Sequence, residues 1–84
     1  MPLYFFDTMD GDARVRDEDG YDLLDLLDLL DLRAARRLAL QALMGIAGDR
    51  VPSGDRRSCS VGVRDAAGRE VYQAKVELTG KWMV

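Results

Sequence analysis

The residues best suited to chemistry in this sequence are carboxylates, and most of them stand in its first third beside glycines. They are Asp7, Asp10, Asp12, Asp17, Glu18, Asp19 and Asp22. Clustered carboxylates near glycines are what a hard cation such as Ca²⁺ requires. The spacing fails, however, because an EF-hand loop with Gly20 at its sixth position would have Val15 first and Leu26 last, and neither is a ligand. We therefore expect solvated turn carboxylates and no metal site.

Histidine is absent and there is one cysteine, Cys59. The lone cysteine cannot form an intramolecular disulfide, and the lack of histidine removes the commonest metal ligand and the commonest general base near neutral pH. Because Cys59 is in phase with Val61 and Val63, we interpret it as a small buried hydrophobic residue rather than a reactive thiol. No nucleophile stands at a useful spacing from a base. We expect a non-catalytic protein with no catalytic residues and no cofactor.

Basic residues are the second group with chemical potential. Residues 1–32 hold ten acids and two arginines, a net charge of −8, whereas residues 33–84 hold five acids and ten bases, a net charge of +5. This split indicates either complementarity within the chain or a partner with its own charge pattern. If they formed one patch, the later arginines would favour a small nucleic-acid-binding protein. These arginines are Arg33, Arg36, Arg37, Arg50, Arg56, Arg57 and Arg64.

The elements that must position these groups belong to a single domain spanning residues 1–84. A chain of 84 residues, 48% hydrophobic and 32% charged, has room for one core. The beginning of the sequence lacks the basic region of a signal peptide, and no stretch of about 18 apolar residues offers a membrane span. We expect a cytoplasmic protein without membrane association.

Two hairpins flank the middle of the chain. The first joins residues 3–6 to residues 13–17 through Asp10-Gly11, and the second joins residues 58–64 to residues 72–78 through a loop that contains Gly68. Residues 3–6 are apolar on both faces of their strand, and we assign Phe5 to the core face.

Between the hairpins, residues 32–44 are strong helix formers, with Asp31 as the candidate N-cap. The order predicts an α+β fold, a two-layer ββαββ unit with a four-stranded antiparallel sheet and one long helix on one face. We predict that the core consists of Phe5, Val15, Leu32, Ala35, Ala39, Leu43, Val61, Val63, Tyr72, Ala74 and Val76.

A leucine and aspartate repeat, Asp-Leu-Leu, runs from Asp22 to Leu32. On a helix, four of its leucines form an amphipathic stripe that faces away from the core side of residues 32–46. A second copy of the chain is the simplest cover for that stripe, so we predict a homodimer. The alternatives are a kink near Asp31 that packs the segment internally and a different protein partner. The predicted interface consists of Leu23, Leu26, Leu27 and Leu30.

Several short motifs occur in a recognisable order along most of the chain, to about Tyr72. They are Met1-Pro2, Tyr4-Phe5-Phe6, Asp10-Gly11, Asp17 with Gly20, Asp31-Leu32, Ala34-Ala35-Arg36, and Asp65 with Gly68. Together they resemble a family of short uncharacterised bacterial proteins of the M-P-x-Y-F-F type, which is classed as a domain of unknown function. The resemblance implies a ββαββ unit and carries no established activity. The repeat and the ending Lys81–Val84 depart from the family pattern.

Overall fold

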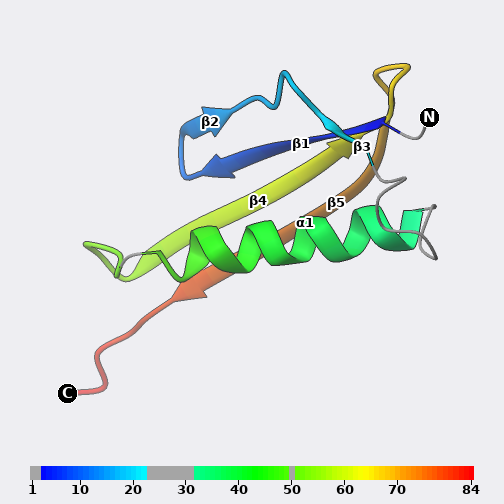
Figure 1. The fold of residues 1–84 in the computed structure, drawn as a ribbon. Helices are drawn as coiled ribbons and strands as arrows, with labels where there is room; N and C mark the ends of the chain where they lie inside the picture. The colour runs from blue at the N-terminus through cyan, green and yellow to red at the C-terminus, as the bar shows by residue number, and fades with distance from the viewer. Residues whose placement is uncertain (1–2, 23–31, 50) are drawn as a thin grey trace.

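The sheet of this protein has its longest strands in the centre and at one edge. The computed structural model describes residues 3–22, 32–49 and 51–84. Within them, the sheet runs in the order β2-β1-β4-β5, all antiparallel, and a short strand β3 also pairs with β1 (Figure 1). The elements are β1 (Leu3–Asp10), β2 (Ala13–Val15), β3 (Tyr21–Asp22), α1 (Leu32–Ala47), β4 (Arg56–Arg64) and β5 (Glu70–Thr79).

The predicted α+β fold, with an antiparallel sheet and one helix, is confirmed. The second predicted hairpin is present, with Val63 paired to Tyr72, and the predicted turn at Asp10-Gly11 joins β1 to β2. The predicted pairing of residues 3–6 with residues 13–17 was wrong, because residues 8–10 pair with residues 13–15, whereas residues 3–4 pair with β3 and residues 5–6 with β4. Strand β3 was not predicted, because two residues are too few to give an alternating pattern. The predicted N-cap Asp31 and the Asp-Leu-Leu repeat up to that residue lie outside the described residues, apart from the backbone of Asp22.

The core lies between α1 and one face of the sheet, which we call the helix face. In Figure 1, α1 runs across β4 and β5. Three alanines of α1 bring its backbone close to the sheet, which leaves room for only small aliphatic side chains beneath it. The fully buried residues are Ala34, Ala35, Ala39, Leu43, Cys59, Val61 and Val63, and Tyr72, Ala74 and Val76 pack against them half-buried. These include eight of the eleven predicted core residues.

The assignment of Phe5 to the core face was wrong. Phe6 pairs directly with the buried Val63, and residues directly opposite each other point to the same face, so Phe6 belongs to the helix face. Phe5 is opposite Arg64 and points to the other face, which we call the open face. Because residues 3–6 are apolar on both parities, their pattern could not identify the face that the helix covers.

Val15 and Leu32 were also wrongly assigned to the core. Val15 is 65% exposed, because β2 is a three-residue edge strand beyond β1 whereas α1 lies mainly over β4 and β5. Leu32 is 50% exposed, and the contact strip of the helix begins at Ala34 instead. No helix in the described part of the chain is long and apolar enough to span a bilayer.

Candidate functional site

An ion pair links β1 to β4 near the carboxyl end of α1. The Arg57 side chain donates from Nε to Oδ1 of Asp10 at 3.1 Å and from Nη2 to Oδ2 at 2.8 Å. The same guanidinium donates to the last helical carbonyls, at 2.9 Å to Ile46 and 3.0 Å to Ala47. Only 10% of the Arg57 side chain and 23% of the Asp10 side chain are exposed.

Arg57 supplies the positive charge that the end of the helix lacks. The last turn of α1 contains no basic residue, and the partial negative charge of its unpaired carbonyls attracts a cation. The hydrogen bonds to Asp10 raise the pKa of Arg57 and outweigh the loss of solvent around it. The Cys59 thiol, buried beside the pair, donates to Oδ1 of Asp10 at 3.5 Å. This cluster therefore joins β1, α1 and β4.

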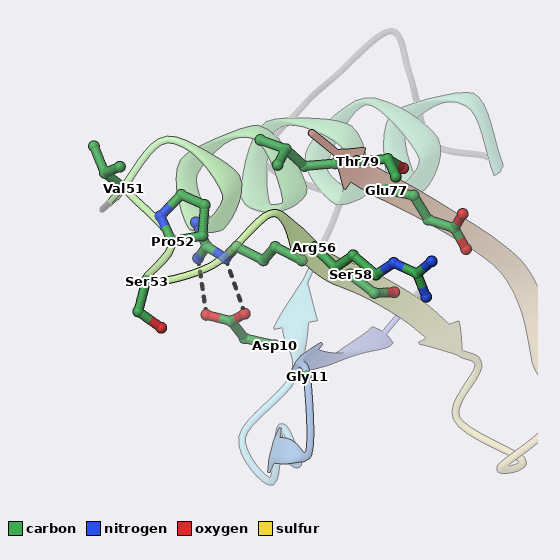
Figure 2. A pocket seen from close by; sticks show the side chains of 11 residues that line it. Asp10, Gly11, Val51, Pro52, Ser53, Arg56, Ser58, Glu77 and Thr79 are labelled. Carbon is green, nitrogen blue, oxygen red and sulfur yellow. Dashed lines mark hydrogen bonds and ion pairs between the residues drawn. The ribbon is translucent and has the colours of Figure 1, made fainter. Parts of the chain in front are cut away.

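A hollow of about 720 Å³ lies next to this cluster, at the end of the sheet. Figure 2 shows Val51, Pro52 and Ser53 on one side of it, with Asp10 in its wall. The groups that line it include the hydroxyls of Ser58 and Thr79 and the charged side chains of Arg56 and Glu77. Asp10 and Arg57 bind each other, as the dashed lines in Figure 2 mark, so this part of the wall is a structural ion pair.

A second cluster lies on the open face, near the other end of β4. Arg64 donates from Nε to Oδ2 of Asp7 at 2.7 Å and from Nη2 to Oδ1 at 3.1 Å, and Nη2 also donates to the carbonyl of Asp17 at 2.9 Å. The guanidinium carbon of Arg64 lies 4.9 Å from the centre of the Phe5 ring. Such stacking suits arginine, whose flat cation is weakly hydrated.

Asp7 and Asp17 are held as carboxylates by their donors. The hydrogen bond from Arg64 is the main cause of the lowered pKa of Asp7, and the backbone N–H of Asp17 adds to it at 3.0 Å. Burial raises the pKa of Asp17, but the backbone N–H groups of Phe6, Gly20 and Asp19 together lower it further than burial raises it. Both acids therefore serve as acceptors for the fold near neutral pH.

Gly20 allows the segment after β2 to close over the open face. Its φ is +77°, a region in which L side chains are strained, and a Cβ built there would lie 2.9 Å from Cε2 of Phe5 and 3.1 Å from Cδ1 of Leu3. A carboxylate oxygen of Asp17 accepts the N–H of Gly20 at 3.0 Å. Gly20, held by its hydrogen bond to Asp17, therefore lies against the Phe5 ring on the face that the helix does not reach, and we call this arrangement the Asp17 and Gly20 cover.

The outer surface of α1 combines apolar and basic side chains. A shallow depression there is lined by Arg36, Arg37, Leu40, Gln41 and Met44. Met44 is 56% exposed, and both arginines are exposed. We call these five residues the outer helix surface.

The structure describes some of the candidate sites predicted from the sequence and leaves one outside the described residues. The predicted interface, Leu23, Leu26, Leu27 and Leu30, lies outside the described residues. Among residues 3–22, 32–49 and 51–84, no acidic or cysteine cluster is arranged to hold a metal ion. Arg57 is mostly buried in its ion pair with Asp10, and Arg64 binds Asp7 on the open face, so neither forms one patch with the exposed arginines of α1.

The sequence analysis did not predict either of the two ion pairs, Asp10 with Arg57 and Asp7 with Arg64. The available signal was the position of Asp7 and Asp10 within a long apolar strand, where a carboxylate needs a partner. The strand that follows the helix begins and ends with arginines, which matches that need.

One comparison with known proteins bears on this arrangement. The model of a family described as a domain of unknown function, DUF6894, matches residues 3–77. The chain belongs to this family. The DUF6894 match includes both ion pairs, the Asp17 and Gly20 cover and all of α1. No curated protein and no solved structure matches the chain.

Proposed function

We propose that this DUF6894 protein is a non-catalytic interaction module that associates with a second copy of itself on its helical side. The observation that carries the proposal is the outer helix surface, where Leu40 and Met44 form an apolar strip beside Arg36 and Arg37. The inward face of α1 is already filled by the sheet, so this strip serves no packing role within the described fold.

The composition of the chain supports a second copy as the partner. Four aspartates precede α1 in the Asp-Leu-Leu repeat, at Asp22, Asp25, Asp28 and Asp31. Leucines at helical spacing between them suit an apolar strip, and the aspartates suit its basic border. A second chain therefore carries the complement of the outer helix surface in its own sequence.

The experiment is analytical ultracentrifugation of the full chain between about 1 and 100 µM, spanning the micromolar range of weak dimers. We expect a concentration-dependent dimer that Met44→Lys or the pair Leu26→Lys and Leu30→Lys weakens, because each change places charge in an apolar contact. Val15→Lys is the matched control, since Val15 is exposed on the distant strand β2. A wild-type chain that sediments as a monomer throughout would contradict the proposal.

A small nucleic-acid-binding protein is the second candidate, and the exposed Arg36 and Arg37 favour it. Phosphate contacts release counterions, so such binding would weaken steeply as salt rises, whereas an apolar contact would respond little. Fluorescence anisotropy with labelled DNA and RNA oligonucleotides at two salt concentrations separates the two functions.

A further inference from the structure

Among the strands that the structure describes, none pairs with the outer edge of β5. This strand has ten residues, Glu70–Thr79, and it stands last in the strand order of the described chain. The opposite edge offers few backbone groups for pairing with another chain, because its strand β2 has only three residues. A long edge strand presents a row of backbone groups that can pair with another chain.

The register of the sheet identifies which backbone groups point outward. The N–H of Gly80 donates to the carbonyl of Asp55 at 2.6 Å, which continues the ladder between β4 and β5. Hydrogen-bonded residues alternate along an antiparallel strand, so the even-numbered residues near this end turn their backbone groups toward β4. The odd-numbered residues Gln73, Lys75 and Glu77 therefore turn their N–H and C=O groups to the open edge.

The charges on β5 select one register for a symmetric pair. Lys75 and Glu77 lie on the open face, 2.7 Å apart between Nζ and Oε1, and both are exposed. An antiparallel two-fold pair centred on Lys75 would oppose two lysines, and one centred on Glu77 would oppose two glutamates. A pair centred on Val76 places Lys75 opposite the partner's Glu77, and places Glu77 opposite the partner's Lys75. Opposite charges in direct cross-strand positions stabilise a sheet, and like charges destabilise it.

We infer that two copies of this protein join through β5 edges in the register centred on Val76, forming one continuous sheet across both chains. This inference rests on the proposed self-association and adds the edge of β5 to the outer helix surface as a contact between the two copies. In this register Leu78, which is 45% exposed on the helix face, lies opposite the partner's Ala74. The pairing therefore covers Leu78 on the helix face. On the open face it places the Lys75 and Glu77 side chains of both copies in a row of alternating charge.

The same register places both helices on one side of the joined sheet. A two-fold axis perpendicular to the sheet leaves both α1 helices on one face. Strands lie about 4.8 Å apart, and α1 covers β4 and β5, so the two helix axes would lie roughly 10 to 15 Å apart. Packed helices lie about 8 to 10 Å apart, so direct contact between the two helices belongs to the short end of this range.

The experiment reverses each charge separately and then together. We expect Lys75→Glu and Glu77→Lys each to raise the dimer dissociation constant about tenfold or more, because each turns two attractive pairs into two repulsive ones. The double variant restores the wild-type constant. A mixture of the two single variants forms heterodimers in preference to either homodimer, since one supplies two acids and the other two bases. Lys81→Glu and Glu18→Lys are the matched controls, being exposed charge reversals outside β5.

The outcomes separate this inference from the proposed function. A wild-type dimer that neither single reversal weakens, but that Met44→Lys disrupts, would overturn the β5 pairing and leave self-association in place. A mixture without preference for heterodimers would also overturn it. A wild-type monomer at all concentrations would overturn both proposals.

Discussion

The carboxylate of Asp17 accepts the backbone N–H of Phe6 at 3.0 Å, across eleven residues of sequence. On its outer side, β1 pairs with β3 at Leu3 and Tyr4 and with β2 from Thr8 to Asp10. Phe6 lies in the gap between these two ladders. A side chain thus completes the edge of a strand at a point where no neighbouring strand reaches it.

Replacement of Asp17 by alanine should destabilise the protein. The change leaves the N–H groups of Phe6 and Gly20 without their acceptor, and losing hydrogen bonds to a partly buried carboxylate costs about 1 to 3 kcal/mol. Urea denaturation followed by circular dichroism measures the free energy of unfolding. Glu18→Ala is the control, because Glu18 is an exposed neighbour and its loss should change stability by less than about 0.5 kcal/mol.

Stability should fall in acid because of Asp7 and Asp17. Both have a pKa lowered from 3.8 in the folded protein, so the unfolded chain takes up protons first as the pH falls. The stabilisation is complete above the unfolded pKa and is lost as the pH falls through the lower folded values. Urea midpoints between pH 2 and 7 should show this loss, and the Asp7→Asn and Asp17→Asn double variant should flatten the curve. Identical curves for the two proteins would refute the assignment.

Alanine should have opposite effects at two glycines. At Gly20 the positive φ costs about 1 to 2 kcal/mol, and the contact with Phe5 at 2.9 Å adds to that cost. At Gly45, inside α1 with nothing within 4 Å of an added Cβ, alanine should stabilise by about 0.5 to 1 kcal/mol. Thermal melts of the two variants beside the wild type test the pair. A Gly20→Ala protein as stable as wild type would show that the cover over Phe5 is loose.

The Arg57→Lys variant should loosen the end of α1. A single ammonium cannot reproduce the flat fork that reaches Asp10, Ile46 and Ala47 together. Hydrogen exchange in a peptide covering residues 43–49 should speed up roughly fivefold or more, whereas exchange in β5 changes less. Arg56→Lys is the control, because Arg56 is exposed. Equal exchange in the two variants would mean that the helix end does not depend on the guanidinium.

The sequence correctly predicted a helix packed on a sheet, but it identified the buried face of β4 and not that of β1. Alternation identified the buried side of β4, since Cys59, Val61 and Val63 are separated by polar or small residues. The same principle failed for Phe5, where neighbouring positions are equally apolar and only the register with β4 distinguishes them. Patterns within one segment carry no information about register between segments.

The ion pairs could not be predicted from local sequence patterns for a related reason. Asp10 and Arg57 are 47 residues apart, and their contact follows from the pairing of β1 with β4 rather than from spacing. The charge split between the two parts of the chain left two interpretations open, complementarity within the chain and a partner with its own charge pattern. The contacts of Asp10 with Arg57 and of Asp7 with Arg64 belong to the first.

The strand order also has a consequence in time. During synthesis β1 is made first, but its central partner β4 follows 47 residues later at the Asp10 and Arg57 contact. At about 5 to 20 residues per second, this interval lasts roughly 2 to 10 s. During this interval the aromatic strand β1 lacks β4, the strand with which it pairs in the folded protein. Until the arginines of β4 are made, they do not neutralise the charges of Asp7 and Asp10 in this strand, and charge favours hydration of the unfinished chain over association with other apolar segments.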